Sequence, residues 1–196
     1  MTATHVARRE GGRYSAVSIV LHWTLAALIV TQIFVGGWFE DLDGGSEKRE
    51  AFALHLSLGV TILALSVVRL LWRVTHPAPP LPDHMARWEK LLARATHVLF
   101  YVFMIGMPIT GWLTISAGGG SGRPLELWGA IPWFRIPGVP EDAHDFFEDA
   151  HTGVLLKSFW FILALHVAGA LKHQFFQRDE VLWRMLPIVG RPRNAP

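Results

Sequence analysis

The chain has 196 residues, of which 51% are hydrophobic and 17% are charged, and its formal net charge is only +2. This composition is too apolar for an ordinary soluble domain and indicates one small helical domain in lipid. The absence of cysteine excludes disulfides, iron–sulfur clusters and thiolate metal sites, and the scattered basic residues argue against a nucleic-acid partner.

Four apolar stretches are each long enough to cross a bilayer, which takes about 20 helical residues. The expected spans cover residues 18–38, 54–74, 95–115 and 154–176, and they predict an all-α, integral membrane four-helix bundle. The first apolar run is longer than that of a typical signal peptide and no small-residue cleavage site follows it, so we expect a retained helix. Pro108 in the third span predicts a kink or an opened backbone.

The connections between the spans differ in charge. The N-terminal segment, the connection between the second and third spans, and the C-terminal tail are basic, whereas the other two connections are acidic. The positive-inside rule therefore places both termini in the cytoplasm. The longest connection, residues 116–150, is rich in Gly, Pro and Trp, and we expect a short interfacial helix at 142–150.

Histidines carry the strongest functional signal. Six of them lie in or at the ends of the predicted spans: His22, His55, His97, His151, His166 and His173. An ionisable side chain at membrane depth is costly and by default indicates function. A single such histidine could equally be a neutral side chain that bridges two helices. Six together favour a functional role.

Depth in the membrane sorts these histidines into pairs. His166 follows His151 by 15 residues (166 − 151), which is about 22 Å along a helix. The fourth span therefore offers one imidazole toward the outer face, at the depth of His55, and one toward the inner face, at the depth of His22. Two axial histidines saturate haem iron and favour electron transfer. The spans lack the acidic residues that a zinc or di-iron site would use.

Other polar residues lie toward the cytoplasmic side. His97 and His173 could donate protons to a quinone, because histidine titrates near neutral pH. Arg69 and Lys172 lie at a similar depth and could bind haem propionates or a reduced quinone, although contact with lipid headgroups is an equally good interpretation.

In these features the chain resembles the bacterial cytochrome b561 family. The segments that carry the resemblance run in order along most of the chain, from Tyr14 to Pro187. They are Tyr14-Ser15 with Ile19 and His22-Trp23, His55 with Gly59 and Val68-Arg69-Leu70, His97 with Tyr101, the stretch from Pro108 to Gly111, the run from His166 to His173, and Arg184-Met185-Leu186-Pro187.

The resemblance implies two b-type haems in a bacterial inner membrane. His22, His55, His151 and His166 match the family's haem ligands, and His173 matches a histidine beside the quinone site. A family member of similar size is a superoxide oxidase, which implies oxidation of superoxide at the outer face and reduction of ubiquinone at the cytoplasmic side.

The resemblance is imperfect in two respects. The gap between His151 and His166 is one residue longer than the family's usual gap, and a π-bulge would restore both side chains to one face. Without such a bulge, His144 or a shifted pairing of the histidines becomes the alternative. The outer connections are net acidic, so superoxide would need a local positive path. The basic residues available for it are Lys48, Arg49, Arg123, Arg135 and Lys157.

Two alternatives to a superoxide oxidase remain open. The chain could be a cytochrome b subunit that passes electrons from a partner dehydrogenase or hydrogenase to quinone. It could also be a non-redox membrane protein, such as a transporter or assembly factor, in which the histidines are structural.

Overall fold

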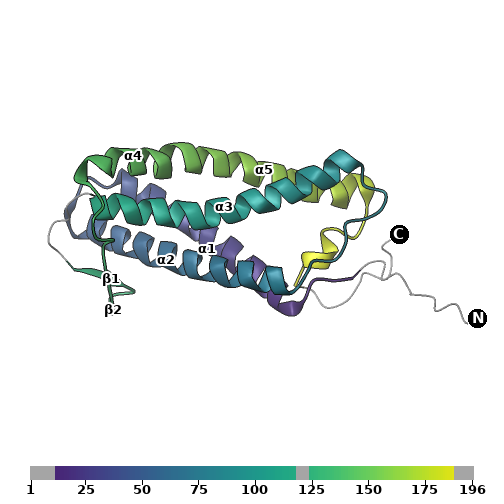
Figure 1. Ribbon diagram of the computed structural model, residues 1–196, viewed down its shortest axis with the longest axis horizontal. Coiled ribbons are helices and arrows are strands. Elements are labelled where there is room, and N and C mark those ends of the chain that lie inside the picture. The colour runs from purple at the N-terminus through teal and green to yellow at the C-terminus, as the bar shows by residue number, and fades with distance from the viewer. Residues whose placement is uncertain (1–11, 118–123, 188–196) are drawn as a thin grey trace, which may run out of the picture.

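Four long helices form one elongated bundle (Figure 1). The structure is a computed structural model that describes residues 12–117 and 124–187. Helix α1 spans Ala16–Asp41, α2 spans Gly45–Thr75 and α3 spans Arg87–Ala117. The fourth helix is built from α4 (His144–Glu148), η2 (Asp149–Leu155), α5 (Leu156–Lys172) and η3 (His173–Gln177). All four are long and apolar enough to cross a membrane, which confirms the predicted bundle.

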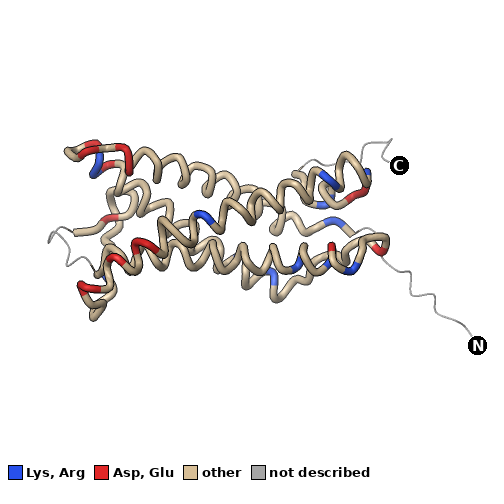
Figure 2. Tube along the Cα trace, turned by 90° about the horizontal axis from the view of Figure 1, so that it is seen from above, with Lys and Arg blue, Asp and Glu red and all other residues tan. Residues whose placement is uncertain are grey.

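The ends of the bundle differ in charge (Figure 2). The terminal end carries the first and last described segments, which meet through a hydrogen bond from the Tyr14 amide to the Arg184 carbonyl. Most basic residues gather there, whereas acidic residues gather at the opposite, distal end (Figure 2). The same difference in charge, seen in the sequence, predicted that the termini lie in the cytoplasm. That orientation stays a prediction. Arg8, Arg9 and Arg123 lie outside the described residues.

Local signals account for where the helices begin and how they continue. Ser15 caps α1, because its hydroxyl accepts a hydrogen bond from the Ser18 amide at 3.2 Å. Helix α3 continues through Pro108, so the backbone does not open there as one alternative predicted. Outward-facing apolar side chains such as Phe34 and Phe176 stay exposed, as lipid contact requires.

The fourth helix begins earlier than predicted. Residues 142–150 are helical, as expected, but η1 (Glu141–Ala143) leads into α4 and the helical chain then continues into the span as far as Gln177. The turn after α4, Asp149–Leu155, is a π-helix, which agrees with the π-bulge expected as one explanation of the long gap between His151 and His166. A π turn accommodates one extra residue and returns the following residues to the same face.

The long connection contains a hairpin that the sequence did not suggest. Strands β1 (Leu125–Leu127) and β2 (Ile131–Trp133) pair antiparallel, and the turn has positive φ at Trp128 and Gly129. The Trp128 amide donates to the Ser57 hydroxyl at 2.9 Å, which attaches the hairpin to α2.

The apolar core lies between two levels of histidine. One cluster joins Leu25, Ile62 and Met104, and the other joins Phe103, Phe159 and Ile162. Phe159 and Ile162 fall between His151 and His166 along the fourth helix. The bundle interior therefore has an apolar middle layer, with one imidazole pair on the side of the distal end and another on the side of the terminal end.

Candidate functional site

The distal level brings His55 of α2 against His151 of η2. Their ring centroids are 6.1 Å apart and the ring planes meet at 81°. Nδ1 of His151 donates to the Met107 carbonyl at 2.8 Å and lies 3.3 Å from the Thr110 hydroxyl. A hydrogen bond at Nδ1 fixes the tautomer and leaves Nε2 to bind a metal.

Two neighbouring side chains hold His55, one at its backbone carbonyl and one against a face of its ring. The Gln32 amide group donates to the His55 carbonyl at 3.0 Å, and the Phe39 ring stacks on the imidazole at 6.2 Å between centroids. Nδ1 of His55 is buried and has no hydrogen-bond partner among the described residues. A buried polar atom without a partner is costly in a protein interior, so this ring has unused capacity for a ligand.

Two glycines, which lack side chains, allow the distal imidazoles to approach the backbones of neighbouring helices. A Cβ atom added at Gly111 would lie 3.0 Å from Cε1 of His151, and one added at Gly36 would lie 3.3 Å from Cε1 of His55. Both separations are shorter than ordinary van der Waals contact. Each distal histidine therefore packs directly on the backbone of a neighbouring helix.

The second level, nearer the terminal end, joins His22 of α1 with His166 of α5. Their ring centroids are 6.2 Å apart, with 63° between the planes. His97 of α3 adjoins this pair, since its centroid is 5.4 Å from that of His166 and its Nδ1 donates to the Ala93 carbonyl at 2.6 Å. Arg69 donates to the Ser18 carbonyl at 3.0 Å and lies within electrostatic reach of His22 and His166.

Both imidazole pairs have the spacing that a shared metal requires. Imidazole nitrogens bind first-row metal ions at about 2 Å, so two nitrogens on opposite sides of one iron lie about 4 Å apart and their ring centroids about 6 Å apart. The measured separations of 6.1 and 6.2 Å agree with this value. The residues present therefore fit two bis-histidine haem sites, one at each level.

The terminal end holds the remaining predicted residues in two contacts. Lys172 forms an ion pair with Glu89 and lies over the Trp88 ring, with 5.5 Å from Nζ to the centroid, so it ties the end of α5 to the start of α3. His173 is buried against Asp179, with 2.6 Å between Nδ1 and Oδ2.

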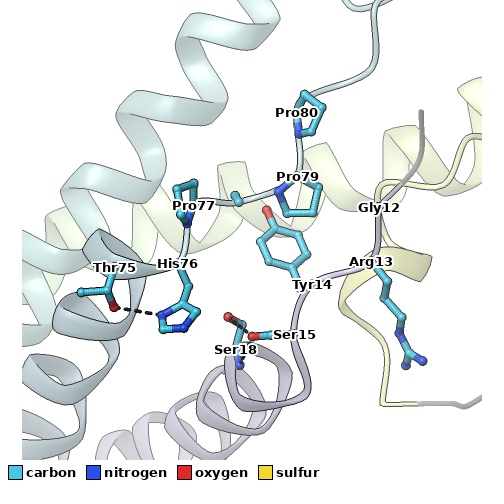
Figure 3. Close-up of a pocket in the computed structure, with 11 residues that line it drawn as sticks. Gly12, Arg13, Tyr14, Ser15, Ser18, Thr75, His76, Pro77, Pro79 and Pro80 are labelled. Carbon is cyan, nitrogen blue, oxygen red and sulfur yellow. Dashed lines mark hydrogen bonds between the residues drawn. The ribbon is translucent and has the colours of Figure 1, made fainter. Parts of the chain in front are cut away.

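A pocket of about 480 Å³ opens at the same end (Figure 3). It lies between the start of α1 and the segment after α2, and its polar lining includes Tyr14, Ser15, Ser18 and Arg13. His76 in its wall is hydrogen-bonded to the Thr75 hydroxyl at 2.9 Å. None of the predicted quinone residues His97, His173, Arg69 and Lys172 lines this pocket, so it does not unite them.

The structure also identifies neighbours of the site that sequence reasoning missed. Gly36, Gly111 and Met107 position the distal imidazoles, and Asp179 holds His173. Gly111 belongs to a segment that carries the resemblance, whereas Asp179 lies in the C-terminal tail, where no motif pointed to it.

Comparison with known proteins agrees with this geometry. Residues 13–187 match the family model described as prokaryotic cytochrome b561. The chain is 34% identical to "Cytochrome b561 homolog 2" of Escherichia coli over 184 residues, which cover 89% of this chain and 91% of that protein. It is 26% identical to "Probable superoxide oxidase CybB" of Yersinia pestis over 181 residues, covering 89% and 96%, and 26% identical to "Cytochrome b562" of Cereibacter sphaeroides over 186 residues, covering 92% and 96%.

Proposed function

The chain belongs to the prokaryotic cytochrome b561 family, a family of haem b membrane proteins, and from this premise we propose that it is a di-haem superoxide:ubiquinone oxidoreductase of the bacterial inner membrane. The observation that carries the proposal is the pair of imidazoles at each of two depths. One haem is bound by His55 and His151 and the other by His22 and His166. Bound haem supplies one-electron transfer between the two ends of the bundle.

The distal end is the side at which superoxide gives up its electron. Lys48 is the basic residue that supports this assignment best, because its Nζ lies 5.1 Å from the centroid of Phe39, and Phe39 stacks on His55. Glu40 lies within electrostatic reach of His151 and partly offsets this charge. A local cation beside the distal pair counters the net acidic loops and attracts an anion.

The terminal end is the side at which quinone is reduced. Two superoxide ions yield two molecules of dioxygen, and one quinone gains both electrons together with two protons. His97 and His173 are the proposed proton-handling residues. Arg69 is a fixed positive charge within electrostatic reach of His97 and of the pair of His22 and His166. Lys172 is engaged with Glu89, and its contact with quinone or a propionate stays a prediction.

A stopped-flow experiment tests the activity. Purified, haem-loaded protein is mixed with superoxide and a soluble ubiquinone analogue in the absence of any partner protein. The proposal expects rapid reduction of the quinone with consumption of two superoxide ions for each quinol formed. Haem-loaded protein that is inert toward superoxide but accepts electrons from a dehydrogenase or hydrogenase would instead establish the electron-carrier subunit.

Replacing Lys48 is expected to slow the reaction with superoxide. Lys48→Gln removes the cation that contacts the Phe39 ring, so the second-order rate should fall by about tenfold, at the lower end of the range for electrostatic steering. Its dependence on ionic strength should also weaken. The rate is measured by stopped flow at several salt concentrations.

Arg49→Gln is the matched control for Lys48→Gln. It lowers the net charge of the start of α2 by the same amount but leaves the Lys48 contact in place. An equal loss of rate in both variants would mean that the overall field, rather than the local cation, guides superoxide.

A further inference from the structure

Asp179 joins two histidines at the terminal end of the bundle. Its Oδ2 lies 2.6 Å from Nδ1 of His173 and 3.0 Å from Nε2 of His84. The side chains of His173 and Asp179 are only 9% and 10% exposed, whereas that of His84 is 54% exposed. The carboxylate therefore faces a buried imidazole on one side and a surface imidazole on the other.

The backbone after α5 sets this contact. Residues His173–Gln177 form the π turn η3, and Arg178 then adopts the left-handed conformation with φ 51°. The chain reverses, so that the Asp179 amide donates to the His173 carbonyl at 3.2 Å. The other carboxylate oxygen, Oδ1, accepts from the Val181 amide at 3.0 Å, which fixes the orientation of the carboxylate.

Asp179 carries a negative charge in this position. Burial alone would raise the pKa of its carboxyl group, but hydrogen bonds from the Val181 amide, His173 and His84 hold that pKa below its ordinary value. A carboxylate that accepts from Nδ1 of a buried histidine holds the ring in one orientation and stabilises its doubly protonated form. In that form the proton on Nε2 is free to be donated.

We propose that Asp179 is a positioning residue that keeps His173 doubly protonated, so that the Nε2–H group of His173 donates a proton to the quinone oxygen. The inference rests on the proposed function and assigns the proton donor of the same site. In each donation the N–H bond at Nε2 breaks and an O–H bond forms on the quinone, whose electrons are those taken from superoxide. The ring is left neutral, with its Nδ1–H group still donating to Asp179. Nε2 then regains a proton from water before the next donation, so that two donations supply the two protons of one quinol.

Other charged groups act on this pair from neighbouring elements. Glu89 of α3 lies within electrostatic reach of His173 but is itself paired with Lys172. His84, in the segment between α2 and α3, shares the oxygen that His173 uses. Arg178 and Glu180 flank Asp179 in the chain. The Asp179 carboxylate contacts the His173 ring directly, so the test removes the charge of Asp179.

The test compares Asp179→Asn, Asp179→Glu and His84→Gln in haem-loaded protein. The first readout is the fraction of doubly protonated His173 at pH 7, taken from the ring ¹⁵N NMR signals of histidine-labelled protein. The second is the pH profile of the quinone reduction rate. Haem content serves as the folding control.

Asp179→Asn is expected to lower both the doubly protonated fraction and the rate at pH 7 by about tenfold or more, as general acid catalysis by one side chain typically contributes 10²–10⁴. Asp179→Glu restores the charge and should recover most of both. His84→Gln removes the surface imidazole from the same oxygen and should leave both within about twofold of the parent.

Two outcomes would overturn the Asp179 assignment while quinone reduction remains intact. One is an unchanged His173 signal in Asp179→Asn. The other is an equal loss in His84→Gln, which would mean that the carboxylate only anchors the segment between α2 and α3. A parent protein that reduces no quinone at all would instead remove the proposed function, and the donor role of His173 with it.

Discussion

His55→Ala and His151→Ala are each expected to lose one haem per chain and to keep the other. Each substitution removes one of the two imidazoles at the distal level, where the ring centroids are 6.1 Å apart, and leaves the pair of His22 and His166 untouched. Loss of one axial ligand leaves haem iron with an incomplete bis-histidine set. The apolar layer between the levels keeps the two sites apart, so the remaining haem should retain its own spectrum.

The measurement for these variants is haem per protein, with the reduced spectrum recorded on the same sample. His22→Ala and His166→Ala should show the complementary loss. His97→Ala and His144→Ala are the matched controls, because both remove an imidazole that lies in neither pair. If His55→Ala kept both haems, or if His97→Ala lost one, the assignment of ligands would be wrong.

Gly111→Ala is expected to weaken the distal haem site without any change in a ligand. The added Cβ would lie 3.0 Å from Cε1 and 3.2 Å from Nδ1 of His151, so the imidazole must shift. Nδ1 also donates to the Met107 carbonyl, so a shift of the ring weakens the hydrogen bond that orients it. Disturbing a group that orients a metal ligand typically costs about 10–100-fold in affinity.

Gly106→Ala is the matched control on the same helix. A Cβ at Gly106 would meet nothing within 4 Å in the described structure, and alanine favours the helix. Haem titration of the two apo-proteins should show a weakened distal site only in Gly111→Ala. Equal affinities in the two variants would show that the close approach of Gly111 to His151 does not position the ligand.

The bundle and the two imidazole levels could be predicted from the sequence because both depend on properties that act along one helix. Apolar length marks each span, and the rise per residue converts the separation of His151 and His166 into a difference in depth. A π turn in the fourth helix was one of the alternatives that the longer gap between His151 and His166 left open, and Asp149–Leu155 forms it.

Other features depend on contacts between segments far apart in the chain. The start of the fourth helix was placed too late, because residues 142–150 are acidic and lack the apolar character of a span, yet they continue the helix. The contact of Gly111 with His151 depends on how α3 packs against the fourth helix. The contact of Asp179 with His173 needs the left-handed turn at Arg178, a conformation that is uncommon for residues other than glycine.

The most direct test of the central claim is the reduced-minus-oxidised absorption spectrum of the purified protein, combined with a count of haem per chain. Imidazoles paired at two depths predict two b-type haems per chain, both low-spin and both with sharp bands on reduction with dithionite. A well-folded protein, produced with an ample supply of haem, that binds none or shows the spectrum of an iron with a single histidine ligand would contradict it.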